Sequence, residues 1–176
     1  PLTKILAYSS IAHLGWMILV IQFAPSLTAL ALITYFMLTS AAFLALNLTR
    51  ATTINTLATM STKAPALTAI FPLVLLSLGG LPPLTGFLPK WLILHQLTKQ
   101  DLPLTATLAA LTALLSLYFY LRLSYAMSLT LSPNTLANTP SWRLPHKSHT
   151  APLSFALATC SLLLPVSPAL MALLAL

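Results

Sequence analysis

The stretch that decides the fold lies at residues 77–91, where the sequence reads Ser77-Leu78-Gly79-Gly80-Leu81-Pro82-Pro83-Leu84-Thr85-Gly86-Phe87-Leu88-Pro89-Lys90-Trp91. It holds three of the chain's four glycines and three of its 14 prolines. Glycine loosens the backbone and proline lacks an N–H donor, so an α-helix cannot run undisturbed through this stretch. We therefore expect a helix break formed by Gly79, Gly80, Pro82, Pro83, Gly86 and Pro89.

The composition around this stretch excludes a soluble protein. Of the 176 residues, 58% are hydrophobic and only 5% are charged, against about 25% charged in an ordinary soluble domain. Eight Lys and Arg outweigh a single acid, Asp101, for a net charge of +7. These cations are scattered singly, so there is no basic patch to meet a nucleic acid. The chain is expected to be an integral membrane protein.

Five apolar stretches predict transmembrane helices. Crossing a hydrocarbon core about 30 Å thick takes about 20 helical residues. The stretches lack the alternation of a β-barrel, so they indicate an all-α membrane protein with a single domain over residues 1–176. Residues 64–98 would extend about 50 Å as one helix, so this third crossing is expected to be discontinuous around Gly79–Pro89. The expected helices cover about residues 5–23, 27–48, 64–98, 102–125 and 152–174.

The basic residues predict an orientation. With five crossings, one side of the membrane receives five cations, and the other receives a turn at 99–101 whose charges cancel. Positive loops collect on the cytoplasmic side of a membrane, or on the matrix side of the mitochondrial inner membrane. The cations that mark this side are Lys4, Arg50, Lys63, Arg143 and Lys147.

Lys90 lies beside the predicted break. From Lys90 to Thr98 is about 12 Å of helix, which places the lysine near the middle of the bilayer. A charge there costs about 2.5–3.5 kcal/mol, and broken helices at this depth mark ion or substrate sites. We interpret Lys90 as a group that handles protons or ions, with its counter-charge or water supplied from outside this chain. The alternatives are a proline kink that only adjusts helix packing and a lysine that reaches to the interface.

His13 is the second candidate, because it lies about 12 Å along the helix from Ile5 and so at a similar depth. An imidazole can accept a proton at one nitrogen and donate one at the other, which suits a relay. The hydroxyls of Ser9 and Ser10, four and three positions earlier, are expected to extend this relay as accessory groups. The alternative is a histidine that simply bonds a neighbouring helix.

Other polar residues in the apolar stretches carry weaker signals. His95 could link Lys90 to the aqueous side, or could be a wet histidine at the interface. We interpret Thr112 and Ser116 as hydroxyls that serve helix packing. Three tyrosines near the end of the fourth expected helix are interpreted as an interfacial aromatic group. They are Tyr118, Tyr120 and Tyr125.

No metal or cofactor site is expected in this chain. His146 and His149 flank Lys147, but no Cys or carboxylate lies nearby to complete a metal site. The chain has a single cysteine and no Gly-rich dinucleotide turn or flavin motif. Binding of NADH, FMN or an iron–sulfur cluster is therefore not expected here.

The chain resembles a known family, mitochondrial NADH dehydrogenase subunit 2, whose members are antiporter-like core membrane subunits of respiratory complex I. The resemblance rests on residues 79–91, quoted above, and on Lys4-Ile5-Leu6-Ala7-Tyr8-Ser9-Ser10-Ile11-Ala12-His13-Leu14-Gly15-Trp16-Met17. It implies an inverted-repeat bundle in which each repeat has a discontinuous helix, with this chain expected to be the C-terminal half. By motif match, Lys90 and His13 would belong to the family's proton-carrying groups.

The function that this resemblance implies is proton translocation across the mitochondrial inner membrane. NADH, FMN, iron–sulfur clusters and ubiquinone would belong to the whole complex. The implied partners are other membrane-arm subunits, the missing N-terminal half and the lipid bilayer, with no nucleic acid. The alternatives are a stand-alone cation/proton antiporter subunit and a structural membrane scaffold.

Overall fold

The computed structural model describes residues 2–49 and 65–129, together with the isolated positions 53, 56, 154, 158, 169 and 172. The expected helix at 152–174, apart from four of these positions, lies outside the described residues. The same holds for six residues discussed above: Arg50, Lys63, Arg143, His146, Lys147 and His149.

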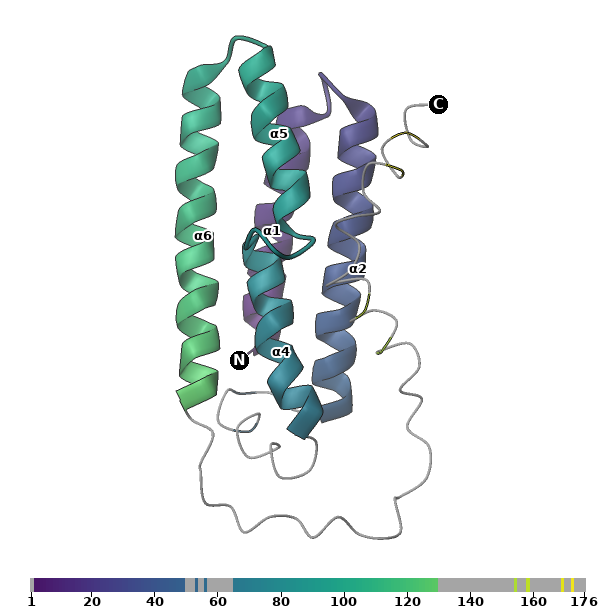
Figure 1. Ribbon diagram of the computed structural model, residues 1–176, viewed down its shortest axis with the longest axis vertical. Coiled ribbons are helices and arrows are strands. Elements are labelled where there is room, and N and C mark those ends of the chain that lie inside the picture. Colours follow the sequence, from purple (N-terminus) through teal and green to yellow (C-terminus); the bar gives the residue numbers. More distant parts are fainter. Residues whose placement is uncertain are drawn as a thin grey trace, which may run out of the picture.

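The described residues form five helices and no strand, which confirms the predicted all-helical architecture for this part of the chain. In Figure 1, α1 and α2 run in opposite directions, α4 and α5 follow one another in the direction of α1, and α6 returns. The helices are α1 (Leu2–Val20), α2 (Pro25–Thr49), α4 (Pro65–Gly79), α5 (Phe87–Lys99) and α6 (Pro103–Leu129).

Proline marks where three of these helices begin. The helices α2, α4 and α6 start at Pro25, Pro65 and Pro103. The first N–H groups of a helix have no partner within it, so a proline there loses no hydrogen bond and its fixed φ suits the first turn. The sequence thus sets these starts locally, before any contact between helices.

Among the described residues, two helices are long and apolar enough to cross a membrane, Pro25–Asn47 and Pro103–Leu129. The apolar parts of α1 and α4, Lys4–Val20 and Ala69–Gly79, are shorter. The whole of α4 has 15 residues and α5 has 13. At 1.5 Å per residue these are about 22 Å and 20 Å long, each short of a hydrocarbon core of about 30 Å. Neither α4 nor α5 therefore crosses a bilayer by itself.

Two apolar clusters hold the bundle together, one on either side of the α4–α5 junction. The first joins α1, α2, α4 and α6 and includes Ala41, Ala42 and Leu78, none of which is exposed. Small residues such as these two alanines let helix backbones approach closely. The second joins α1, α2, α5 and α6 around Val20 and Ile93. The junction lies between the two clusters, at mid-height in the bundle (Figure 1).

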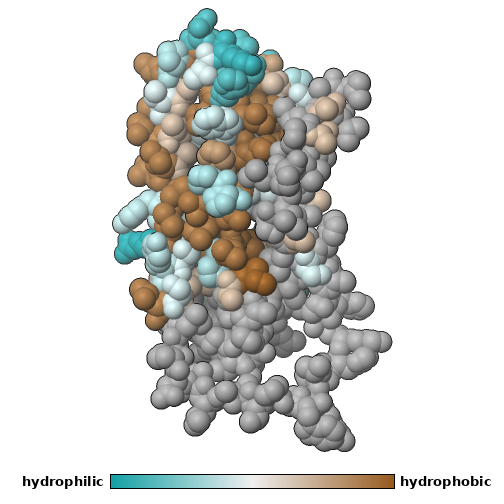
Figure 2. All heavy atoms as spheres, viewed as in Figure 1, coloured by the Kyte–Doolittle hydropathy of each residue, from teal (hydrophilic) through white to brown (hydrophobic). Residues whose placement is uncertain are grey.

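The outer surface of the described bundle is apolar. Among the coloured residues in Figure 2, hydrophobic ones predominate along the bundle, and hydrophilic residues gather at the end where α5 turns into α6. On α6 the exposed residues include Leu104, Leu108, Leu111 and Leu115, with exposed fractions of 55–70%. So much exposed leucine on one helix indicates a surface in contact with lipid or other protein.

Gly86 allows α5 to begin directly against α4. It is the N-cap residue of α5, with φ −66° and ψ −17°. A Cβ atom at this position would overlap the backbone carbonyl oxygen of Ser77 on α4. The hydroxyls of Ser77 and Thr85 lie 3.5 Å apart at the same contact. A glycine is therefore required here by the close approach of two backbones, although its own φ is ordinary.

We expect Gly86→Ala to lower the free energy of unfolding by about 1–3 kcal/mol, the usual effect of forcing extra volume into a well-packed site. Gly15→Ala is the matched control, because a Cβ at Gly15 meets nothing within 4 Å. The measurement is the thermal midpoint of the full-length protein in its membrane assembly. Equal midpoints for the two variants would contradict the close approach of Gly86 to α4.

Candidate functional site

The C-terminal cap of α4 forms the first part of the site. The N–H of Gly80 donates to the carbonyl of Ser77 at 3.0 Å, and the N–H of Leu81 donates to that of Leu76 at 3.3 Å. Gly80 has φ +88°, the left-handed conformation that glycine adopts without steric cost. These are the two bonds of a glycine-ended helix C-cap. They leave the carbonyl of Gly79, the last residue of α4, to find a partner elsewhere.

Lys90 supplies that partner. Its Nζ donates a hydrogen bond of 2.9 Å to the carbonyl oxygen of Gly79, and the residue is only 8% exposed. The C-terminal end of a helix carries about half a negative charge, which favours a nearby cation. From the sequence, the counter-charge of Lys90 or its water is expected to come from outside this chain. The structure adds a partial negative charge within the chain, at the C-terminal end of α4.

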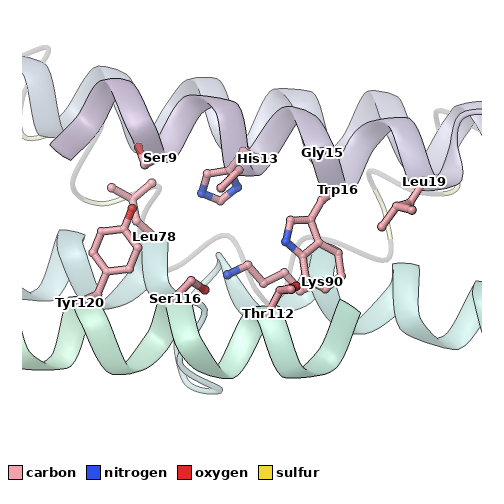
Figure 3. A pocket seen from close by; sticks show the side chains of 11 residues that line it. Ser9, His13, Gly15, Trp16, Leu19, Leu78, Lys90, Thr112, Ser116 and Tyr120 are labelled. Carbon is pink, nitrogen blue, oxygen red and sulfur yellow. The ribbon is translucent and has the colours of Figure 1, made fainter. Parts of the chain in front are cut away.

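A cavity of about 340 Å³ lies beside this hydrogen bond, between α1, α4, α5 and α6. Figure 3 shows His13 projecting into it from α1 and Lys90 projecting from the opposite side. The structure therefore brings together the two ionisable residues that the sequence singles out. The other polar side chains that line the cavity are Ser9, Thr112, Ser116 and Tyr120, and its apolar walls include Trp16, Leu19 and Leu78.

His13 and Lys90 also line a second, much smaller cavity on the side of α2. Its volume is about 20 Å³, and about 10–15 Å³ is enough to hold one water molecule. Thr34 and Tyr35 of α2 line it as well. The ring centroids of His13 and Tyr35 are 4.9 Å apart, with their planes inclined at 34°. The lysine and the histidine therefore border both the large cavity and the small one.

The two serines expected to accompany His13 take different places. Ser9 is 5% exposed and lines the large cavity, whereas Ser10 is not among the residues that line either cavity. Both hydroxyls donate within α1, from Ser9 to the carbonyl of Leu6 and from Ser10 to that of Ala7, each at 2.6 Å. Ser9 can therefore offer the cavity its oxygen as an acceptor.

His95 does not reach this site. It is exposed and lines a separate hollow of about 200 Å³ with Trp91, Leu94 and Thr98. Five positions along a helix turn a side chain by about 140°, so Lys90 and His95 face different directions. The interpretation of His95 as a link between Lys90 and the aqueous side therefore gains no support from a shared cavity.

The contribution of α6 to the site is not predicted from the sequence. Thr112 and Ser116, interpreted above as hydroxyls for helix packing, line the large cavity together with Tyr120. Tyr120 is 6% exposed, so its assignment to an interfacial aromatic group is wrong, whereas Tyr118 and Tyr125 are 64% and 63% exposed. The signal that could have found the three is their spacing, because residues 112, 116 and 120 fall on one helix face.

Metal binding finds no support in the described part of the chain. Its residues contain no group of three or more His, Cys, Asp or Glu side chains that could hold an ion. The site is instead a lysine, a histidine and several hydroxyls around a cavity. Such groups can donate, accept and pass protons.

Comparison with known proteins gives the class of protein to which this arrangement belongs. Residues 2–116 match the sequence model of the family described as "NADH:quinone oxidoreductase/Mrp antiporter, TM". This match covers more than half of the chain, and the chain therefore belongs to that family of membrane proteins. Residues 117–171 match a second model, described as "NADH dehydrogenase subunit 2 C-terminus".

Individual relatives are similar along nearly the whole chain. It is 64% identical over 175 residues to "NADH-ubiquinone oxidoreductase chain 2" of Salmo salar, covering 99% of this chain and 50% of the relative. For the protein of the same name in Danio rerio, the identity is 62% over 170 residues, covering 97% and 49%. The chain spans about half the length of the curated relatives it matches.

We expect Gly80→Ala to destabilise the end of α4 by about 1–2 kcal/mol, the usual cost of the left-handed conformation for a residue with a Cβ. The new Cβ would also lie 3.1 Å from Cδ and 3.2 Å from Nζ of Lys90, so the ammonium must shift. Gly80→Asn should lose less, because asparagine tolerates this conformation. The thermal midpoint of the full-length protein should fall in the order Gly80, Gly80→Asn, Gly80→Ala. A higher midpoint for Gly80→Ala than for Gly80→Asn would refute the requirement for a positive φ at this position.

Proposed function

We propose that the chain is part of a core membrane subunit of respiratory complex I, the NADH:ubiquinone oxidoreductase, and that it contributes to proton translocation. The family and the names of the relatives support this assignment. The observation that carries it is the convergence of Lys90 and His13 on one cavity inside an apolar bundle. Ionisable groups are expensive in a membrane, so a pair facing a shared cavity is a functional arrangement.

In this proposal Lys90 is the group that gains and loses a proton. Its ammonium rests on the Gly79 carbonyl, and a proton that leaves Nζ passes to water in the large cavity. His13 receives the proton at one ring nitrogen and releases one from the other. The oxygens of Ser9, Ser116 and Tyr120 line the same cavity and offer further steps for a proton.

The broken backbone supports a lysine that changes charge. Lys90 lies in the first turn of α5, whose N-terminal end carries a partial positive charge, while it bonds the negative end of α4. The two helix ends therefore act on the ammonium with opposite sign. Because the two effects oppose each other, small movements of nearby charges can shift the balance between the charged and the neutral form of Lys90.

We propose that α4 and α5 form one interrupted crossing. Each is too short to span a bilayer alone, and they lie end to end in Figure 1. Irregular backbone at membrane depth is tolerated when it is buried in protein or lines a wet cavity, and Lys90 and the cavity adjoin residues 80–86. The crossing would be the discontinuous helix of the second of two inverted repeats.

The proposed location is the mitochondrial inner membrane, with the N-terminal end of α1 on the matrix side. Lys4 lies at this end, and the turn with Lys99 and Asp101 lies at the other. The positive-inside rule then directs the basic loops to the matrix.

The proposed partners are the other membrane-arm subunits of the complex, the remaining half of the same subunit and the surrounding lipid. The apolar outer surface of α6 supports such contacts. NADH, FMN, iron–sulfur clusters and ubiquinone would act elsewhere in the complex. This chain would use the released energy without holding a cofactor of its own.

One observation favours a second candidate, a purely structural role. Because Lys90 caps the end of α4 through Gly79, the lysine could serve only to hold the helix break together. A hydrogen bond to a charged group contributes about 1.5–3 kcal/mol, which is enough to explain a buried lysine. The two roles differ in what happens to proton transfer when the complex still assembles.

Lys90→Met in the assembled complex tests the proposal. We expect the proton-transfer step through this subunit to slow by about 10²-fold or more, the usual loss when a positioned acid–base group is removed. The measurement is the rate of proton translocation in sealed vesicles, normalised to the amount of assembled complex, together with the number of protons translocated per electron. Lys99→Met is the matched control, because Lys99 ends the same helix and is exposed. Unchanged stoichiometry with reduced thermal stability would establish the structural role instead.

A further inference from the structure

Tyr35 lies against His13 across the interface between α2 and α1. Their ring centroids are 4.9 Å apart and their planes are inclined at 34°, within the 4.5–7 Å over which aromatic rings attract one another in offset or tilted arrangements. Both residues are half-buried. The contact therefore lies at the proposed relay.

The imidazole of His13 needs a contact with another side chain to fix the plane of its ring. The torsion that turns a histidine ring about its Cβ–Cγ bond is broad and roughly two-fold, so the helix alone does not set the plane of the ring. Within the part of the chain that the structure describes, no hydrogen bond holds the ring of His13, and its ring contact is with Tyr35. The tyrosine ring is therefore the aromatic neighbour that can limit the plane of the imidazole and the directions in which its two nitrogens point.

The plane of this ring matters because His13 borders two cavities. The large one contains Lys90 and the hydroxyls of α6, and the small one is closed on the side of α2 by Thr34 and Tyr35. Thr34 is 5% exposed and donates to the Ala31 carbonyl at 3.0 Å, which leaves its oxygen able to accept a bond. A proton relay through His13 needs one ring nitrogen to face the large cavity while the other faces the small cavity.

We propose that Tyr35 is the positioning residue of His13, holding the imidazole in the plane that presents one nitrogen to each cavity. This inference rests on the proposed function, because it gives the relay through His13 a defined geometry. The tyrosine acts through its ring and touches no transferred proton. A merely structural Tyr35 would instead fill space between α1 and α2, where it also contacts Phe36 at a centroid distance of 6.5 Å.

The test uses the full-length subunit in the assembled complex and measures the rate of proton translocation, normalised to the amount of assembled complex. Tyr35→Leu removes the ring, and we expect it to slow proton transfer by about two- to tenfold, the change in population that one aromatic pair controls. Tyr35→Phe keeps the ring and should restore transfer to the level of the unaltered protein. Should Tyr35→Leu fail to assemble, Tyr35→Met serves as a second variant without a ring. Phe43→Leu is the control, because Phe43 is an aromatic residue on the same helix that is 48% exposed.

A double variant distinguishes a positioning role of Tyr35 from a purely structural one. If Tyr35 acts through His13, Tyr35→Leu adds no further loss once His13→Ala is present, because contacting residues in one unit are not additive. Additive losses, or a Tyr35→Phe variant as slow as Tyr35→Leu, would overturn the positioning role. If His13→Ala slows transfer while Tyr35→Leu does not, the inference about Tyr35 alone fails. If His13→Ala leaves transfer unchanged, the relay itself fails, and the role of Tyr35 fails with it.

Discussion

The hydrogen bond from Lys90 to the carbonyl of Gly79 is the contact on which the rest of the site depends. It joins the beginning of α5 to the end of α4, across a link of seven residues. The C-cap at Gly80 makes the Gly79 carbonyl available, and Gly86 allows the two helices to come close enough for the bond to form. Either a continuous helix or a wider gap would remove it.

The energies of this contact are balanced. A charged side chain in the middle of a bilayer costs about 2.5–3.5 kcal/mol. A hydrogen bond to a charged group returns about 1.5–3 kcal/mol, and a helix end in favourable geometry adds up to about 2 kcal/mol. The end of α4 therefore offsets much of the cost of burying a charged Lys90, whereas the start of α5 acts against it. The neighbouring cavity adds hydroxyls near Lys90, which a fully apolar site would lack.

Sequence reasoning finds the individual groups of the site better than their neighbours. Lys90 and His13 stand out because an ionisable residue in a long apolar stretch is rare, and both line the cavity. Tyr120 was assigned to the interface because aromatic residues are common there, yet it packs against Gly79 inside the bundle. Tyr35 carried no signal at all, since its importance comes from lying opposite a residue on another helix.

The sequence by itself determined the class of protein, the helix starts at proline and the end of α4 at Gly79, because these follow from composition and from the backbone chemistry of a few residues. Tertiary structure alone decided which carbonyl Lys90 binds, that Thr112, Ser116 and Tyr120 turn toward His13, and that His95 turns away. The physical reason is that side chains on separate helices meet only through the rotation and depth of each helix in the bundle. Those two quantities depend on every contact between helices, whereas a helix end depends on its own few residues.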